Sequence, residues 1–216
     1  YDAQVFWDRL LSISPWHGVT SVVMGNCGFG VAPTYPKHRD LILRTLENVE
    51  GMSLSALQAG LGAEWPFQTF PEYLETVGRL PKGINYGAYI GHSALRMYTM
   101  GERALSERAT REDLRKMGHS VVEALRAGAL GFSTSRSTTH TTPDGSPIAS
   151  RIAEWRELDY IVGEMAKVNA GVFQIGPDIS SGKAGRAFFR RLRKLALTTG
   201  RPIMVPTAAT KQGVRP

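Results

Sequence analysis

The chain has 216 residues, a formal net charge of +7 and a single cysteine. One cysteine cannot form an internal disulfide, which excludes a disulfide-rich secreted scaffold and favours a reducing, cytoplasmic setting. No stretch approaches the roughly 20 consecutive apolar residues that cross a bilayer, so no membrane partner is expected. The length is sufficient for one domain with a sizeable core.

Short apolar segments alternate with amphipathic ones along the whole chain. The predicted strands are 19–24, 84–90, 129–133, 171–175 and 202–206. The predicted helices lie between them, at 38–49, 71–80, 111–127, 153–168 and 183–199. This alternation predicts βα units and a parallel sheet. An open doubly wound sheet fits the same alternation and is the alternative architecture.

Several predicted helix ends carry local signals. Thr69 with Glu72, and Thr110 with Asp113, have the spacing of capping boxes at helix N-termini. A glycine follows each of the helical runs 111–127 and 183–199, where a left-handed residue ends a helix. The local signals therefore agree with the hydrophobic pattern.

The first predicted strand runs into Gly-Asn-Cys-Gly-Phe-Gly, residues 25–30. Its glycines permit positive φ angles and close backbone approach around Cys27. The carboxyl end of a parallel strand is where α/β enzymes place their chemistry. Cys27 is therefore a candidate nucleophile or metal ligand, and the alternative is a cysteine that only packs in the interior.

Six segments carry a resemblance to a known family. They are Tyr-Asp-Ala-Gln at 1–4, Ser-Pro-Trp-His-Gly-Val-Thr at 14–20, Val-Met-Gly-Asn-Cys-Gly-Phe-Gly-Val-Ala-Pro at 23–33, Arg-Thr-Leu-Glu-Asn-Val-Glu-Gly-Met at 44–52, Gly-His-Ser-Ala-Leu-Arg at 91–96 and Ala-Gly-Ala-Leu-Gly-Phe-Ser-Thr at 127–134. In this order they resemble the N-acyl-D-amino-acid deacylases, the D-aminoacylase branch of the metal-dependent amidohydrolase superfamily. The resemblance covers most of the chain up to about Ser150.

This resemblance implies a metal-centred (β/α)8 barrel, which needs about 250 residues. The chain would supply about five βα units, so that residues 1–216 form part of one catalytic TIM-barrel domain, incomplete at both ends. The family's His-x-His motif would lie just before Tyr1, and its catalytic aspartate beyond Pro216. Cys27 would be a zinc ligand, since zinc accepts thiolate together with imidazole and carboxylate. The implied reaction is hydrolysis of N-acyl-D-amino acids to a carboxylate and a free amino acid.

One position departs from the family. The family places a metal-binding histidine near the end of the strand at 171–178, where this chain has Ile175, Gly176 and Pro177. Gln174 offers only an amide oxygen, a poor replacement for an imidazole. Two alternatives follow: a nucleophilic cysteine paired with a histidine, and a non-catalytic relict or interaction segment that lacks a complete metal site.

Two side chains are candidate substrate-binding residues. Arg136 follows a predicted strand, and a guanidinium binds a carboxylate through two parallel hydrogen bonds. His92 follows the strand before it and is expected near the mouth of the site. The alternative for His92 is a structural histidine that orders its loop together with Ser93 and Arg96. His140 lies in the polar loop 135–146, where it could approach a substrate.

The basic segment 183–194 is of a kind that binds nucleic acid or anionic lipid in other proteins. Four apolar residues recur there at helical spacing and are expected to face the barrel, with the arginines on the solvated side: Phe188, Phe189, Leu192 and Leu195. We therefore expect no nucleic-acid partner and a small-molecule N-acyl amino acid as substrate. The 216 residues alone are expected to be inactive and to associate through open strand edges.

Overall fold

The computed structural model describes residues 1–62, 64–177 and 182–206. Within them, five parallel strands form one sheet in the order β1-β2-β3-β4-β5. The strands are β1 (Ser21–Met24), β2 (Asn85–Gly91), β3 (Gly131–Ser135), β4 (Val172–Gly176) and β5 (Ile203–Met204). Each strand lies next to its predecessor in the chain, so the order never reverses as it does in a doubly wound sheet. The alternative architecture is therefore wrong, and the partial barrel is confirmed.

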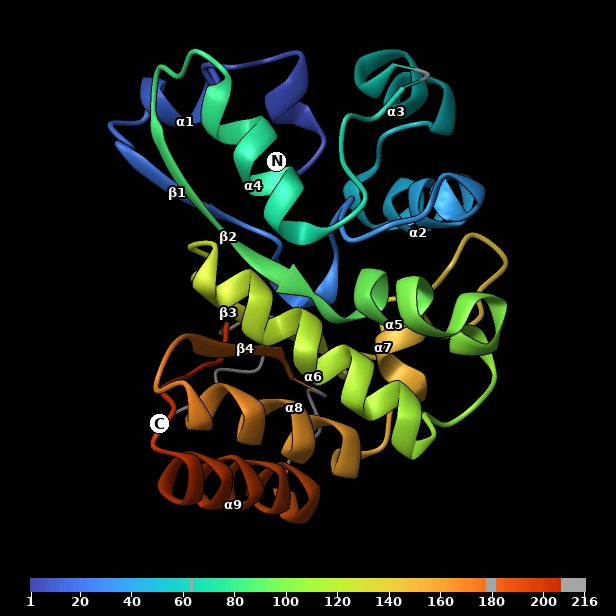
Figure 1. The fold of residues 1–216 in the computed structure, drawn as a ribbon, viewed down its shortest axis with the longest axis vertical. Coiled ribbons are helices and arrows are strands. Elements are labelled where there is room, and N and C mark those ends of the chain that lie inside the picture. Colours follow the sequence, from blue (N-terminus) through green and yellow to red (C-terminus); the bar gives the residue numbers. More distant parts are fainter. Residues whose placement is uncertain (63, 178–181, 207–216) are drawn as a thin grey trace.

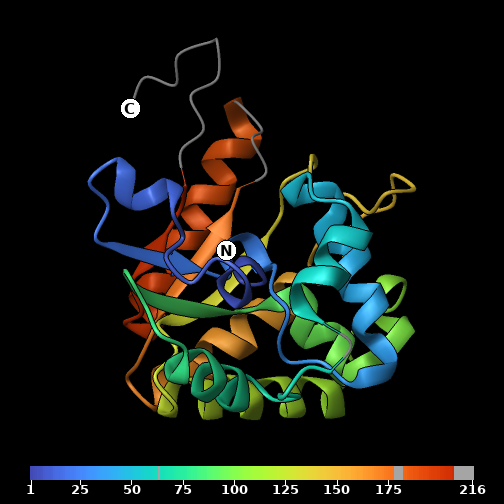
Figure 2. The same ribbon diagram turned by 90° about the horizontal axis from the view of Figure 1, so that it is seen from above.

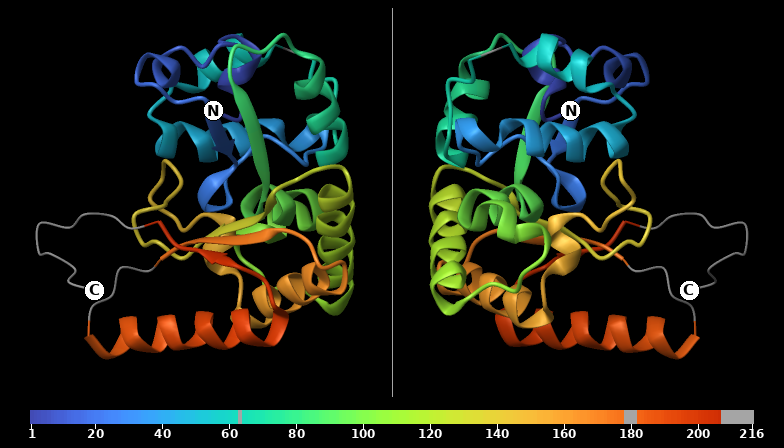
Figure 3. Two further views of the ribbon diagram at one scale, coloured as in Figure 1. Left: turned by 90° about the vertical axis from the view of Figure 1, so that its left-hand side faces the viewer. Right: turned by 90° about the vertical axis from the view of Figure 1, so that its right-hand side faces the viewer.

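The helices lie outside this sheet (Figure 1). They are α1 (Ile13–Trp16), α2 (Arg39–Glu50), α3 (Leu54–Leu61), α4 (Phe70–Arg79), α5 (His92–Met100), α6 (Arg111–Arg126), α7 (Ala149–Ile152), α8 (Trp155–Lys167) and α9 (Gly182–Thr199). Helices α6, α8 and α9 follow one another along the outer side of the strands (Figure 3). Helices α2 and α3 pack together, well apart from α9 (Figure 2).

Each of the five predicted strands and five predicted helices is present, with bounds that differ by one or two residues. Both capping boxes form, at the starts of α4 and α6. Helix α5 is not predicted by the periodicity, because most of its residues are buried and it shows no clear polar face. It begins directly at the end of β2, so His92 lies in its first turn rather than in a loop.

The two central strands have faces of opposite character, because successive side chains of a strand point to opposite sides. Phe132 of β3 stacks on Phe173 of β4, with ring centroids 5.8 Å apart, on the side covered by helices. Ser133 and Gln174, the next residues of these strands, both contact the turn after β1 instead. The apolar face builds the core beneath the helices, and the polar face builds the candidate site.

Helix α9 differs from its prediction in one residue. Leu192 and Leu195 are buried, and Phe188 packs edge-on against Trp155, with centroids 5.8 Å apart. Phe189 is 57% exposed and does not face the barrel. The reason is the helical period: Phe189 is rotated by about 100° from Phe188 and leaves the face that contacts α8.

The sheet has two strands, β1 and β5, that are paired on one side only within the described part of the chain. Val23 of β1 and Met204 of β5 are 40% and 37% exposed. The open edges that the sequence predicts, and association through them, remain predictions. No helix in the described ranges is long and apolar enough to cross a membrane.

Candidate functional site

The turn between β1 and α2 presents Cys27 at the carboxyl end of the sheet. Residues Asn26–Gly28 form a 3-10 turn in which Cys27 itself adopts a left-handed φ of 57°. The Asp2 carboxylate accepts the N–H of Gly25 at 3.0 Å. A Cβ on Gly25 would lie 2.2 Å from the carbonyl oxygen of Tyr89, so only glycine lets the turn lie this close to β2. The thiol is half-buried.

Two fully buried side chains of the central strands hold the turn in place. The Oε1 atom of Gln174 accepts the N–H of Cys27 at 2.6 Å, and its Nε2 lies 3.8 Å from the Cys27 sulfur. The hydroxyl of Ser133 accepts the N–H of Gly28 at 3.0 Å. The backbone of Cys27 is therefore fixed by strands far away in the sequence, which is how a reactive group is kept in one geometry.

The thiol and a second polar group both lie close to Gly176 at the end of β4. A Cβ on Gly176 would lie 3.3 Å from the Cys27 sulfur and 3.1 Å from the hydroxyl oxygen of Ser135. That hydroxyl lies 2.7 Å from Nδ1 of His140. The imidazole of His140 packs edge-on against Phe29, with centroids 5.1 Å apart. The site thus brings together a thiol, a hydroxyl, an amide and an imidazole.

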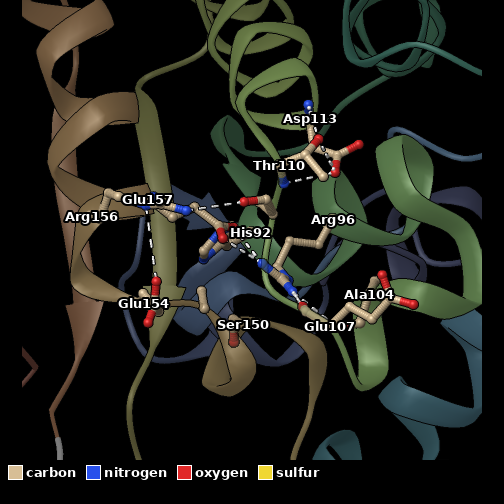
Figure 4. A network of polar contacts seen from close by, with 12 residues as sticks. His92, Arg96, Ala104, Glu107, Thr110, Asp113, Ser150, Glu154, Arg156 and Glu157 are labelled. Carbon is tan, nitrogen blue, oxygen red and sulfur yellow. Dashed lines mark hydrogen bonds and ion pairs between the residues drawn. The ribbon is translucent and has the colours of Figure 1, made fainter.

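His92 lies in a different environment, a buried ionic network (Figure 4). Its Nε2 is 2.7 Å from Oε1 of Glu157, and its Nδ1 is 2.8 Å from the hydroxyl of Thr134. Arg96 donates from Nη1 to both oxygens of Glu157 and from Nη2 to the carbonyl of Glu107 at 2.7 Å. Because both ring nitrogens are engaged and the side chain is inaccessible, the structure favours the structural alternative for His92 over substrate binding.

The charges in this network set the protonation of its members. Burial lowers the pKa of His92, against the opposing effect of its hydrogen bond to Glu157. Burial alone would raise the pKa of Glu157, but His92 and Arg96 outweigh it and the pKa lies below its ordinary value. Glu157 is therefore favoured as a carboxylate, hydrogen-bonded to His92 and paired with Arg96, and the network joins α5 to α8.

Arg136 extends toward the junction of α7 and α8. Its Nη1 donates to the carbonyl of Ala153 at 2.6 Å, and its guanidinium lies 5.7 Å from the ring centroid of Trp155. Its backbone N–H donates to the carbonyl of Gly176 at 2.8 Å, which ties β3 to β4 at their carboxyl ends. The side chain contacts thus hold this junction together, and a role in substrate binding stays a prediction.

The fit of a metal ion was tested against the side chains present. A thiol at the end of a parallel strand is a suitable zinc ligand. Within the residues that the structure describes, however, no group of three His, Cys, Asp or Glu side chains is placed to hold a metal ion. Cys27 qualifies as one ligand, and the described residues do not complete the set.

Sequence reasoning underrated the polar face of the central strands. Ser133 and Gln174 hold the turn through hydrogen bonds, and Ser135 contacts His140 beside Gly176. Each of the three looks like an ordinary strand residue when read alone. The usable signal is the alternation in Gly-Phe-Ser-Thr-Ser (131–135) and Val-Phe-Gln-Ile-Gly (172–176), which places Gly131, Ser133, Ser135, Gln174 and Gly176 on one face. Such a polar inner face indicates a lined site rather than a purely apolar core.

Comparison with known proteins gives consistent results. No family model matches the chain. An uncharacterized protein of Mycobacterium tuberculosis is 32% identical over 197 residues, covering 88% of the chain and 31% of the relative. The D-aminoacylase of Alcaligenes xylosoxydans xylosoxydans is 32% identical over 117 residues, 54% of the chain and 21% of that enzyme. The N-acyl-D-glutamate deacylase of the same organism is 34% identical over 117 residues, with the same coverage.

Solved structures agree in fold. The crystal structure of D-aminoacylase, reported to define a novel subset of amidohydrolases, superposes with a TM-score of 0.69 at 22% identity, covering 94% of the chain and 38% of that protein. N-acyl-D-glutamate deacylase from Bordetella bronchiseptica, complexed with zinc and a phosphonate inhibitor, gives 0.68 at 22% identity, covering 94% and 37%. The fold is therefore that of part of an amidohydrolase barrel.

The sequence matches show that the chain is a homologue of D-aminoacylase and of the N-acyl-D-glutamate and N-acyl-D-aspartate deacylases, and the fold agrees with this. The chain spans about a third of the length of the mycobacterial relatives.

Proposed function

We propose that this chain contributes part of the catalytic barrel of a zinc-dependent amidohydrolase that hydrolyses N-acyl amino acids, foremost N-acyl-D-amino acids, to a carboxylate and a free amino acid. The observation that carries the proposal is the half-buried thiol of Cys27, fixed at the carboxyl end of β1 and lying close to Gly176 at the end of β4. Its support from outside the site is the homology to D-aminoacylase and to two N-acyl-D-amino-acid deacylases.

In this proposal Cys27 is one zinc ligand, and the other ligands come from outside the described residues. Gln174 and Ser133 orient the ligand by accepting the N–H groups of Cys27 and Gly28. Zinc, when bound, polarises an acyl carbonyl and lowers the pKa of a water molecule. A reducing compartment keeps the thiol available for metal, which agrees with the cytoplasmic setting expected from the sequence.

The test uses the intact protein from which the chain derives, because the chain spans only a third of its mycobacterial relatives. Cys27→Ser is the main variant, since a hydroxyl has a similar volume and is a much poorer zinc ligand. We expect zinc content and hydrolysis of N-acetyl amino acids to fall together, and a thiolate-to-metal absorption band of the cobalt-substituted protein to disappear. His119→Ala, on the exposed side of α6, is the matched control. Full zinc content in Cys27→Ser contradicts the assignment.

One observation favours a second candidate, a non-catalytic relict of the same fold. The described part of the chain holds no group of three His, Cys, Asp or Glu side chains that could bind a metal ion, and Gly176 occupies the strand end that faces the sulfur. A panel of N-acyl-D- and N-acyl-L-amino acids separates the two candidates. An intact protein that retains no zinc and hydrolyses none of the panel supports the relict.

A further inference from the structure

His140 is held beside the Cys27 turn by three separate contacts. Its Nδ1 lies 2.7 Å from the hydroxyl oxygen of Ser135, and its ring packs against Phe29, which follows the turn. Its backbone carbonyl accepts a hydrogen bond from Nη1 of Arg151 at 3.0 Å. A loop side chain fixed in this way has little freedom left to lose on binding a ligand.

The hydrogen bonds of Ser135 determine which nitrogen of His140 carries the proton. The Ser135 hydroxyl is fully buried, and its oxygen accepts the N–H of Ser137 at 3.0 Å. A buried hydroxyl proton needs an acceptor of its own. The acceptor that the structure provides is Nδ1 of His140. The neutral ring therefore carries its proton on Nε2 and presents a donor there.

The surroundings of the ring favour this neutral form. Burial, followed by the positive charge of Arg151, lowers the pKa of His140 below its ordinary value. Among the described residues no group accepts a hydrogen bond from Nε2, and the side chain is only partly buried. The guanidinium of Arg151 also adds positive potential around the ring. The environment thus suits an acceptor oxygen, and more so one that carries negative charge.

We propose that His140 binds substrate by donating a hydrogen bond from Nε2 to an oxygen of the N-acyl amino acid. This proposal rests on the function proposed above and adds a residue that determines specificity within the same site. The oxygen belongs either to the substrate carboxylate or to the acyl carbonyl, which share the acceptor chemistry. Ser135 acts as a positioning residue, because its hydroxyl fixes the ring orientation and the tautomer.

Steady-state kinetics of the intact holoenzyme test the proposal with three variants. His140→Ala removes the donor, His140→Gln retains an amide N–H, and His119→Ala is the control on α6. We expect kcat/KM for an N-acetyl amino acid to fall about ten- to a hundredfold in His140→Ala, which corresponds to one hydrogen bond to a charged group. His140→Gln should recover part of the loss. An unchanged kcat/KM in His140→Ala overturns the proposal.

The substrate series distinguishes the two oxygens. If His140 binds the carboxylate, His140→Ala raises KM for the N-acetyl amino acid and leaves the corresponding N-acetyl amino acid amide unaffected. If it binds the acyl carbonyl, kcat falls for both compounds, since the hydrogen bond strengthens as charge develops on that oxygen. Both outcomes support the proposal.

Nitrogen-15 spectra of the imidazole provide a readout that does not depend on turnover. We expect a protonated Nε2 and an unprotonated Nδ1 in the free protein, with a shift of the Nε2 signal when an N-acetyl amino acid is added. Ser135→Ala should weaken the preference for this tautomer. A ring protonated on Nδ1 overturns the proposal. If an N-acetyl amino acid shifts this signal but is not hydrolysed, the binding role of His140 is supported and the proposed enzymatic function is refuted. If the substrate is hydrolysed equally well by His140→Ala, the enzymatic function is supported and the role of His140 is refuted.

Discussion

The buried network of His92, Arg96 and Glu157 allows a quantitative prediction about stability. Glu157→Gln keeps the size and one acceptor oxygen of the side chain but removes its negative charge. Arg96 then retains its bonds to two backbone carbonyls and loses its counter-charge, while its Nε already lacks a partner in the described structure. A guanidinium left without its carboxylate in a desolvated site is strongly unfavourable.

The magnitude follows from burial. The side chains of Arg96 and Glu157 are 0% and 3% exposed. Removing one partner of such a pair costs about 3–5 kcal/mol, a large part of the 5–15 kcal/mol typical of a domain. The control is Asp159→Asn on the same helix. Asp159 pairs with Arg191, and their side chains are 46% and 42% exposed, so its loss should cost about 0–1 kcal/mol.

Urea-induced unfolding, followed by tryptophan fluorescence, measures both free energies of unfolding. We expect Glu157→Gln to lose several times more than Asp159→Asn at an unchanged m-value. The double variant Arg96→Met with Glu157→Gln should recover part of the loss, because no unpaired charge remains. A loss in Glu157→Gln as small as that in Asp159→Asn would refute the reasoning, since it would mean that the network is solvated.

Three further predictions concern pH and local structure. Burial lowers the pKa of His92 below 6.5, so the unfolded chain binds more protons at this residue than the folded one. The free energy of unfolding should therefore fall as the pH drops below 6.5. In urea titrations at several pH values, His92→Gln should make this pH dependence less steep. Gly131→Ala would place a Cβ 1.9 Å from the carbonyl oxygen of Val172 and should lower the free energy of unfolding by about 3 kcal/mol. Its control is Gly163→Ala on α8, whose Cβ would meet no atom within 4 Å. In thermal melts this control should be neutral or stabilising. Thr110→Ala removes the N-cap of α6 and should lower the free energy of unfolding by about 1 kcal/mol, and an unchanged melting curve would contradict the cap.

The sequence by itself determined the five strands, the five long amphipathic helices between them and their parallel arrangement. Strands 19–24 and 171–175, the capping box at Thr110 and the glycine-rich turn at Cys27 are all set by residues within a few positions of one another. Backbone conformation and hydrophobic periodicity are local properties, so local patterns predict them well. Which residues of a helix face the core is predicted less well, as the exposed side chain of Phe189 shows.

Only the tertiary structure decided which side chains meet at the site. Cys27 and Gln174 lie 147 positions apart, and nothing in either segment indicates their hydrogen bond. His92 looks like a residue at the mouth of the site until α8 brings Glu157 against it and buries it. Strand alternation, register and helix packing are non-local. These non-local features place Ser135 and Gln174 on the side of the Cys27 turn and bury His92. Short patterns in the sequence do not predict these positions.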